Sequence, residues 1–148
     1  MSDTVEAKDY DGDGDLDLII GSKRDGAFLI VNEGTRKAPV YSNDKTKLMA
    51  AGDTHIQGGN AHWVDWDGDG NNDLVLGDEK GGIVFHKNLG DNKAPKYAAA
   101  KELLPKPARG AVGPGNRTKV LMTDYNQDGK QDLLVGDIGG YVWVLLRK

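Results

Sequence analysis

The sequence predicts an all-β fold built from repeated four-stranded antiparallel sheets, and three observations support this prediction. Short apolar runs separated by Gly, Asn and Asp recur along the whole chain of 148 residues, which is typical of all-β proteins. Glycine is abundant, at 21 residues, and no segment has a convincing helical pattern. One acidic motif also occurs three times at a spacing of tens of residues, and such a spacing indicates a repeat architecture.

The acidic motif occupies residues 9–21, 65–77 and 124–136, and its central copy reads DWDGDGNNDLVLG. All copies share one frame: Asp, aromatic, Asp or Asn, any residue, Asp, Gly, any two residues, Asp, Leu, two apolar residues, Gly. A single copy could be an ordinary acidic turn, because Asp, Asn and Gly are common turn residues. A random turn would not keep this frame three times, so the motif marks a repeated unit.

The repeat extends beyond the motif. Residues of the first and second units match at a constant offset of 56, whereas the third motif is offset by 59. The repeat units therefore run over about 3–58, 59–115 and 116–148, the last one truncated, within a single propeller-type domain of 1–148. The matching pairs are Asn32 and Asn88, Gly34 and Gly90, Lys37 and Lys93, Ala38 and Ala94, Pro39 and Pro95, and Tyr41 and Tyr97.

Each unit is interpreted as four short strands. In the central unit, the acidic loop joins the first two strands, a turn around Lys80-Gly81 joins the next two, and a Pro-containing crossing leads to the fourth. We expect Pro95 at the entry of that fourth strand, where a missing N–H donor does least harm. The third unit ends with a third strand, and its fourth is absent. In the central unit the expected strands are 61–66, 73–77, 82–88 and a segment near 96–104.

The expected strands are near-continuous apolar runs such as DLIIG, LVLG and VWVLL, which indicates sheets covered on both faces. Four-stranded sheets stacked on their sequence neighbours describe the blades of a β-propeller. The chain holds roughly two and a half to three blades, and a ring takes about four to eight. We therefore expect self-association, most simply a dimer of about six blades. A fragment of a larger propeller and an open stack are the alternatives.

The acidic loops crowd carboxylates closely enough to need a cation. Two unit charges about 4 Å apart repel by about 1 kcal/mol in water and by more near a protein surface. Calcium prefers six to eight oxygen ligands, so each loop predicts one structural Ca²⁺, up to three per chain. The glycine at position six allows the sharp turn, and Asp15, Asn71 and Lys130 offer backbone carbonyls. The expected ligand residues are Asp9, Asp11, Asp13, Asp15 and Asp17; Asp65, Asp67, Asp69, Asn71 and Asp73; and Asp124, Asn126, Asp128, Lys130 and Asp132.

The three sites are not expected to bind equally. The third should be weakest, because Asn126 replaces a carboxylate and Lys130 adds a positive charge. The first should be tightest if Asp15 adds outer-sphere charge. Position twelve is Ile20, Leu76 or Val135, where a helical calcium-sensor loop has a bidentate Glu, so a helix-opening switch is not expected.

The motif Asp-x-Asp-x-Asp-Gly-x-x-Asp-Leu followed by two apolar residues and Gly resembles the FG-GAP or VCBS repeat. That repeat forms blades in integrin alpha-subunit propellers and in many secreted bacterial proteins. The resemblance covers nearly the whole chain, and it implies calcium-bearing propeller blades and an extracellular or cell-surface parent protein. Because the family is functionally diverse, the resemblance implies no particular reaction.

Composition excludes several functions. The net charge is −4 and no long basic run appears, so nucleic acid is not an expected partner. Cysteine is absent, which rules out disulfides and thiolate chemistry. No run of 18 apolar residues predicts a membrane span, and the first ten residues lack the apolar segment of a signal peptide.

Two functional classes remain. The first is a non-enzymatic binding or scaffolding module for a protein or glycan, and the second is part of a propeller-type carbohydrate-active enzyme, a polysaccharide lyase or hydrolase. The enzyme needs an acid–base pair, for which His55 and His62 with Asp53, in an expected loop at 51–63, are the candidates. Because a structural role is commoner for such histidines, we expect no catalysis. Tyr10, Trp66 and Tyr125 share one motif position, which favours shared packing over sugar stacking.

Overall fold

The structure, a computed structural model, describes residues 3–78, 80–108 and 112–148. Within these residues it consists of strands and loops with no helix, which confirms the all-β prediction. Its strands are β1 (Thr4–Lys8), β2 (Asp17–Ser22), β3 (Gly26–Ile30), β4 (Thr46–Lys47), β5 (Met49–Ala50), β6 (Thr54–His55), β7 (Gly59–Val64), β8 (Asp73–Gly77), β9 (Ile83–His86), β10 (Lys101–Leu104), β11 (Lys119–Thr123), β12 (Asp132–Gly136) and β13 (Val142–Leu145).

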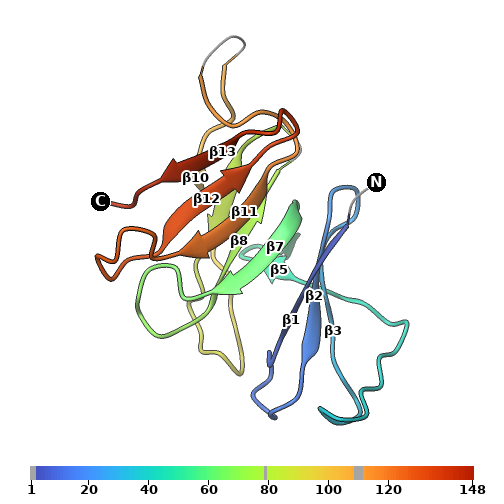
Figure 1. The fold of residues 1–148 in the computed structure, drawn as a ribbon. Coiled ribbons are helices and arrows are strands. Elements are labelled where there is room, and N and C mark those ends of the chain that lie inside the picture. Colours follow the sequence, from blue (N-terminus) through green and yellow to red (C-terminus); the bar gives the residue numbers. More distant parts are fainter. Residues whose placement is uncertain (1–2, 79, 109–111) are drawn as a thin grey trace.

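Three antiparallel sheets follow one another along the chain, as predicted for successive blades. The first has the order β1-β2-β3-β4, the second β10-β9-β8-β7, and the third β11-β12-β13. Figure 1 shows the three sheets side by side in chain order, with the central sheet between the other two. We call them blades one, two and three.

Strand register places the three acidic loops at equivalent positions. Each loop joins the first two strands of its blade, and the last residue before it pairs with the position-nine aspartate after it. These closing pairs are Lys8 with Asp17, Val64 with Asp73, and Thr123 with Asp132. The loops are therefore hairpin connections, as the motif predicts.

The apolar core lies between the blades. Leu74, Val75 and Leu76 of β8 are all 0% exposed, because blade two has a neighbour on each side. Leu74 and Leu76 belong to the cluster shared with blade one, which includes Ile19 and Trp63. Val75 belongs to the cluster shared with blade three, together with Phe85, Val120 and Val135 among others. Burial on both faces explains why the strand sequence does not alternate between apolar and polar residues.

The fourth strand of blade two differs from its prediction. It begins at Lys101 instead of near residue 96, so Pro95 does not stand at its entry. The intervening Tyr97 is 5% exposed and bridges to Asn88 and Ala50. Its hydroxyl lies 3.1 Å from that of Tyr10. Residues near Tyr97 therefore pack between blades one and two instead of extending the fourth strand.

The segment 51–63 is also not the open loop that its polar, glycine-rich composition predicts. Residues 54–55 form β6, which pairs with β5, and residues 59–63 lie in β7. Ile56 between them is 1% exposed, and its carbonyl accepts a hydrogen bond of 2.8 Å from Ala27 N. Ile56 thus anchors the segment against blade one, together with the buried Ala61 and Trp63.

Candidate metal centres

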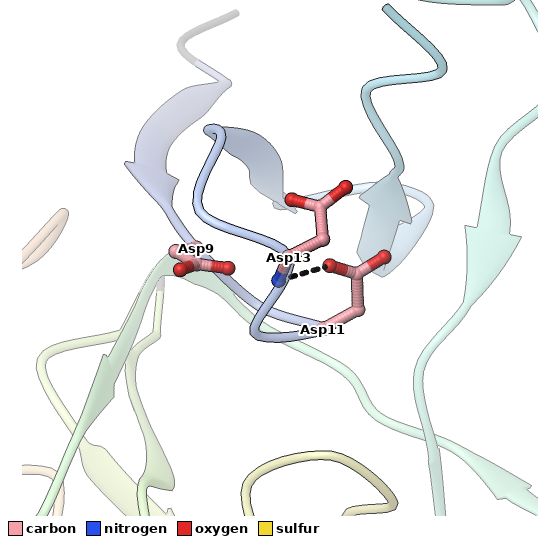
Figure 2. A group of neighbouring side chains, drawn as sticks. All are labelled: Asp9, Asp11 and Asp13. Atoms are coloured by element: carbon pink, nitrogen blue, oxygen red, sulfur yellow. Dashed lines mark hydrogen bonds between the residues drawn. The ribbon is translucent and has the colours of Figure 1, made fainter. Parts of the chain in front are cut away.

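The first acidic loop brings its carboxylates together. Oxygen atoms of Asp9, Asp11 and Asp13 all lie within 4.8 Å of one another. Figure 2 shows these three side chains on the loop between β1 and β2, with the hydrogen bond from Asp13 N to Asp11 Oδ1 dashed. Such a group of carboxylate oxygens matches the ligands that calcium prefers.

The position-one aspartate organises each loop around itself. Asp9 Oδ1 accepts a hydrogen bond from Gly12 N at 2.8 Å, and Asp9 Oδ2 accepts one from Gly14 N at 3.1 Å. Asp65 accepts the equivalent hydrogen bonds from Gly68 N and Gly70 N, and Asp124 accepts hydrogen bonds from Asp128 N and Gly129 N. Backbone donors therefore offset part of the negative charge, so the loops do not rely on a cation alone for their shape.

The position-nine aspartates have a structural task that the sequence did not reveal. Asp17, Asp73 and Asp132 are each 0% exposed. One oxygen of each accepts from the backbone N–H that follows the first aspartate of its motif, and the other accepts from a residue beyond the third strand. In blade one these donors are Tyr10 N at 2.9 Å and Asn32 N at 2.8 Å. Each buried carboxylate thus ties the acidic loop to the third strand.

Left-handed backbone allows the tight winding of each loop. Position six is Gly14, Gly70 or Gly129, with φ of 97°, 89° and 87°, a region that glycine enters without strain. Each of the three loops therefore has a left-handed glycine at position six, as the sequence predicts. Position four is also left-handed, with φ of 60° at Gln127 in the third loop.

The second loop gathers a different set of carboxylates. Oxygens of Asp65, Asp67 and Asp73 lie within 4.8 Å of one another, and Asp69 is not in this group. Across the described part of the chain, the third loop does not form such a group of carboxylates. There the Asn126 amide donates to Asp128 Oδ2 at 3.1 Å, which uses an oxygen that a metal ion could otherwise bind.

The ammonium of Lys87 reaches the second loop and was missed by sequence reasoning. It forms ion pairs with Asp67 and, at 2.7 Å, with Asp69. The hydrogen bond from Lys87 lowers the pKa of the Asp69 carboxyl. In the first loop, by contrast, desolvation and then the neighbouring carboxylates raise the pKa of Asp11. The signal in the sequence is a lysine just after the third strand, but only the fold brings it to the loop.

The residues expected at position seven make the same backbone contact in each loop, but their side chains differ in burial. Asp15 is only 6% exposed, and its Oδ1 has no hydrogen-bond partner among the described residues. Burial, and after it the charge of Asp13, raises the pKa of the Asp15 carboxyl. The backbone N–H of Asp15, Asn71 and Lys130 donates at 2.9 Å to the position-five carboxylate of its own loop.

A second contact that the sequence did not predict holds the outer rim of two loops. Arg36 donates to the Gly14 carbonyl at 3.1 Å, and Asn92 donates to the Gly70 carbonyl at 3.1 Å. The two residues occupy equivalent positions in the crossing after the third strand. The crossing therefore fixes the position-six carbonyl in blades one and two.

The histidines make structural contacts. His55 Nε2 bonds the Ala27 carbonyl at 2.9 Å, and His86 Nδ1 bonds the Ala98 carbonyl at 2.9 Å. Burial lowers the pKa of His86. His62 lies 3.0 Å from Asn60 Nδ2 and 3.5 Å from Glu6. Within the ranges that the structure describes, no hydrogen bond or ion pair joins Asp53 to a histidine.

The aromatic residues of the motif pack where a following blade covers them. Tyr10 is 7% exposed and lies 4.9 Å from Trp63, measured between ring centroids. Trp66 is 8% exposed beneath Arg147, which lies 5.3 Å from its ring centroid. Tyr125 in blade three is 58% exposed. The shared packing role thus holds at two of the three positions.

The repeated blades and acidic loops have a counterpart among known families. A family model described as the FG-GAP-like repeat matches residues 9–75 and 65–135. The chain belongs to this family. Each FG-GAP-like match starts at the first aspartate of one acidic loop and ends in the second strand of the next blade. In this FG-GAP-like protein each matched segment therefore spans parts of two neighbouring blades.

The remaining comparisons add no relative. Neither the curated proteins nor the solved structures that were compared with this FG-GAP-like chain gave a match. Among the described residues, there is no helix with the length and apolar character needed to cross a membrane.

Proposed function

We propose that the chain is a calcium-binding FG-GAP-like module in which Ca²⁺ stabilises the acidic loops and the blades present a surface to a protein or glycan. One observation carries the metal proposal: the oxygens of Asp9, Asp11 and Asp13 converge within 4.8 Å. Like charges held this close repel one another, and a hard cation with oxygen ligands removes that repulsion.

The ligands in this proposal are the aspartates at positions one, three and five (Asn126 replaces the position-three aspartate in the third loop), the carbonyl at position seven and the aspartate at position nine. The last of these is already buried and bonded to backbone N–H groups in each blade. A bound ion would therefore join the exposed end of the loop to a fixed point in the core. The role is structural, and no catalytic step is assigned to the metal.

The test is thermal unfolding with calcium and with excess chelator. A ligand that binds only the folded state stabilises it by about 2.7 kcal/mol at a hundredfold excess over its Kd. We expect a clearly higher Tm in calcium, and a smaller increase in magnesium, which prefers octahedral geometry and keeps its waters. The Asp9→Asn variant should lose part of the calcium effect, while Asp44→Asn, outside the loops, should keep it. Superimposed melting curves in calcium and chelator would contradict the proposal.

The surroundings of the module are part of the proposal. The FG-GAP-like repeat is typical of extracellular proteins, so we place the module outside the cell or at its surface. Extracellular calcium would then be available to the loops. Binding to a glycan or protein without turnover is the expected activity, and it is tested by array binding followed by analysis of the bound ligand for cleavage.

We also propose that blade three packs on blade one of a second copy. Leu121, Val142 and Val144 of blade three are 57%, 71% and 41% exposed. Their equivalents in blade two are His62, Ile83 and Phe85, and the last two lie in the core shared with blade three. The same positions are therefore already used for contact between blades inside the chain, which favours a head-to-tail neighbour of the same kind.

A further inference from the structure

Among the described residues, only the central acidic loop has ion pairs to its carboxylates, and both come from Lys87. It follows β9, and its ammonium contacts the carboxylates of Asp67 and Asp69. The equivalent residues are Val31 in blade one and Leu146 in blade three. Neither of these can carry a charge, so no ion pair can form from this position in the other two blades.

The carboxylates of the central loop are arranged around this ammonium. In the first loop, Asp13 completes the group of converging oxygens with Asp9 and Asp11. Its equivalent, Asp69, does not join the central group and instead bonds Lys87 at 2.7 Å. In the central loop, which has Lys87, the position-five carboxylate therefore lies outside the group of converging oxygens.

Asp67 lies between the ammonium and the cage. Its Oδ2 accepts from Lys87, whereas its Oδ1 is buried and has no hydrogen-bond partner among the described residues. A buried carboxylate oxygen without a partner is costly, and a metal ion bound with Asp65 and Asp73 would satisfy it. The same side chain is therefore shared between a protein cation and the candidate metal position.

We propose that Lys87 is a tethered cation that competes with calcium for the central loop. This inference rests on the proposed calcium binding. The ammonium keeps the central loop closed when no metal is present, and calcium must displace it before Asp69 can become a ligand. The central site therefore requires more calcium than the first site, so the two loops fill over different ranges of calcium concentration.

The competition follows from charge and tethering. An ammonium and a divalent ion held a few ångströms apart repel, so both cannot occupy the loop at full strength. The lysine side chain is a flexible stem with a single charged end, which allows it to leave the loop for solvent without moving the backbone. Lys87 is about one third exposed at its side chain (36%), so that path is open.

The test is a calcium titration that reads each loop separately. The backbone amide signals of Gly14, Gly70 and Gly129 report the three loops in one NMR spectrum. In the natural sequence, we expect Gly70 to reach half-saturation at a higher calcium concentration than Gly14. In Lys87→Val, which copies the residue of blade one, the Gly70 midpoint should fall about tenfold, as expected for removing one nearby unit charge, while the Gly14 midpoint stays unchanged.

Two variants control the titration. Val31→Lys places a lysine at the equivalent position of blade one, and it should raise the Gly14 midpoint. Lys47→Val removes the same charge from the distant strand β4, and it should move no midpoint. Without metal, Lys87→Val should melt about 1–4 °C below the natural protein, because the carboxylates lose their counter-charge.

The outcomes separate the two proposals. If Gly14 responds to calcium but the Gly70 midpoint is the same in the natural protein and in the Lys87→Val variant, the competition is overturned and calcium binding stands. If no glycine signal responds to calcium, the proposed function fails. In that case an unchanged metal-free melting temperature of Lys87→Val would also remove the role of Lys87 in keeping the loop closed.

Discussion

At the scale of single residues, the residues packed around the glycine that ends each acidic motif determine whether a side chain would fit there. A Cβ placed on Gly21 would lie 2.6 Å from the backbone nitrogens of Asn60 and Ala61, and one on Gly77 would lie 2.9 Å from the Thr118 carbonyl. At Gly136 no heavy atom of the described residues beyond its chain neighbours lies within 4 Å of that position. The glycine therefore provides room for the next blade to approach.

We predict opposite results for two alanine substitutions in this motif. Gly21→Ala should lower the free energy of unfolding by about 1–3 kcal/mol, since the new methyl group forces two backbones apart. Gly136→Ala should be neutral or slightly stabilising, because it restricts the unfolded chain without a clash. Urea unfolding of both variants checks this. If both variants lost the same free energy of unfolding, the close approach of the next blade would not explain the glycine.

Gln127 has a left-handed backbone conformation that is unfavourable for a residue other than glycine. It occupies position four of the third loop with φ of 60°, where the other two loops have Gly12 and Gly68. Left-handed backbone costs a non-glycine residue roughly 1–2 kcal/mol. The third loop thus carries a strain that the other loops lack.

We predict that Gln127→Gly stabilises the protein by up to about 1 kcal/mol. The matched control is Gln131→Gly in the same loop, which is not left-handed and should destabilise the fold by about 0.5–1 kcal/mol. Thermal unfolding in chelator measures both without a contribution from metal. A loss of stability in both variants would contradict the strain at position 127.

At the scale of elements, Glu6 joins β1 of blade one to β7 of blade two. Its carboxylate accepts a hydrogen bond from Trp63 N at 2.8 Å, and it lies 3.5 Å from His62 and 3.7 Å from Lys8. Burial raises the pKa of Glu6, but the hydrogen bonds from His62 and Trp63 and the nearby positive charges outweigh it. The net result is a pKa below the ordinary value of 4.5.

We predict that this contact weakens in acid. Because the folded-state pKa is lowered, the ionised carboxylate contributes stability that is present above about pH 4.5 and is lost as the pH falls through the lower folded-state value. Glu6→Gln should be about 1–2 kcal/mol less stable at pH 7, and the difference should shrink toward pH 3. Unfolding free energies across this range provide the measurement.

A matched variant controls for the general effect of acid. Glu102→Gln changes an exposed carboxylate on β10 and should follow the natural protein at every pH. A deficit of Glu6→Gln that stays constant from pH 7 to pH 3 would show that Glu6 acts through its size or packing and not through its charge.

At the scale of the whole molecule, exposure changes from blade to blade at equivalent positions. Ile83 in blade two is 0% exposed, whereas its equivalent Val142 in blade three is 71% exposed. Tyr125 is likewise exposed where Tyr10 and Trp66 are buried. Blade three therefore presents an apolar face of the kind that marks interaction surfaces.

We predict that this face mediates association between copies of the chain. The mass in solution, measured by light scattering with and without calcium, should exceed that of one chain. Val142→Lys should reduce it to that of a monomer, because a charge in an apolar contact is costly. Leu89→Lys, at an equally exposed leucine outside this face (66% exposed), should leave the mass unchanged. A monomeric natural protein would contradict the proposal.

The sequence alone determined the all-β class, the three acidic hairpins and the order of strands, because these depend on local periodicity and on turn residues repeated in one frame. It also placed the glycines at position six, which a left-handed turn requires. It did not predict that Tyr97 leaves the fourth strand to pack between blades, nor that residues 51–63 fold into β6 and β7. Those outcomes depend on burial against residues distant in the chain.

Only the tertiary structure decided how equivalent residues differ. The motif gives Asp67 and Asp11 the same position, yet Lys87 contacts Asp67, whereas the equivalent residue in blade one is a valine. It makes Tyr10, Trp66 and Tyr125 equivalent, but only the first two are covered by a following blade. The physical reason is that a repeat specifies each sheet and its loop locally, whereas burial, charge pairing and close approach depend on which neighbouring residues the fold brings within a few ångströms.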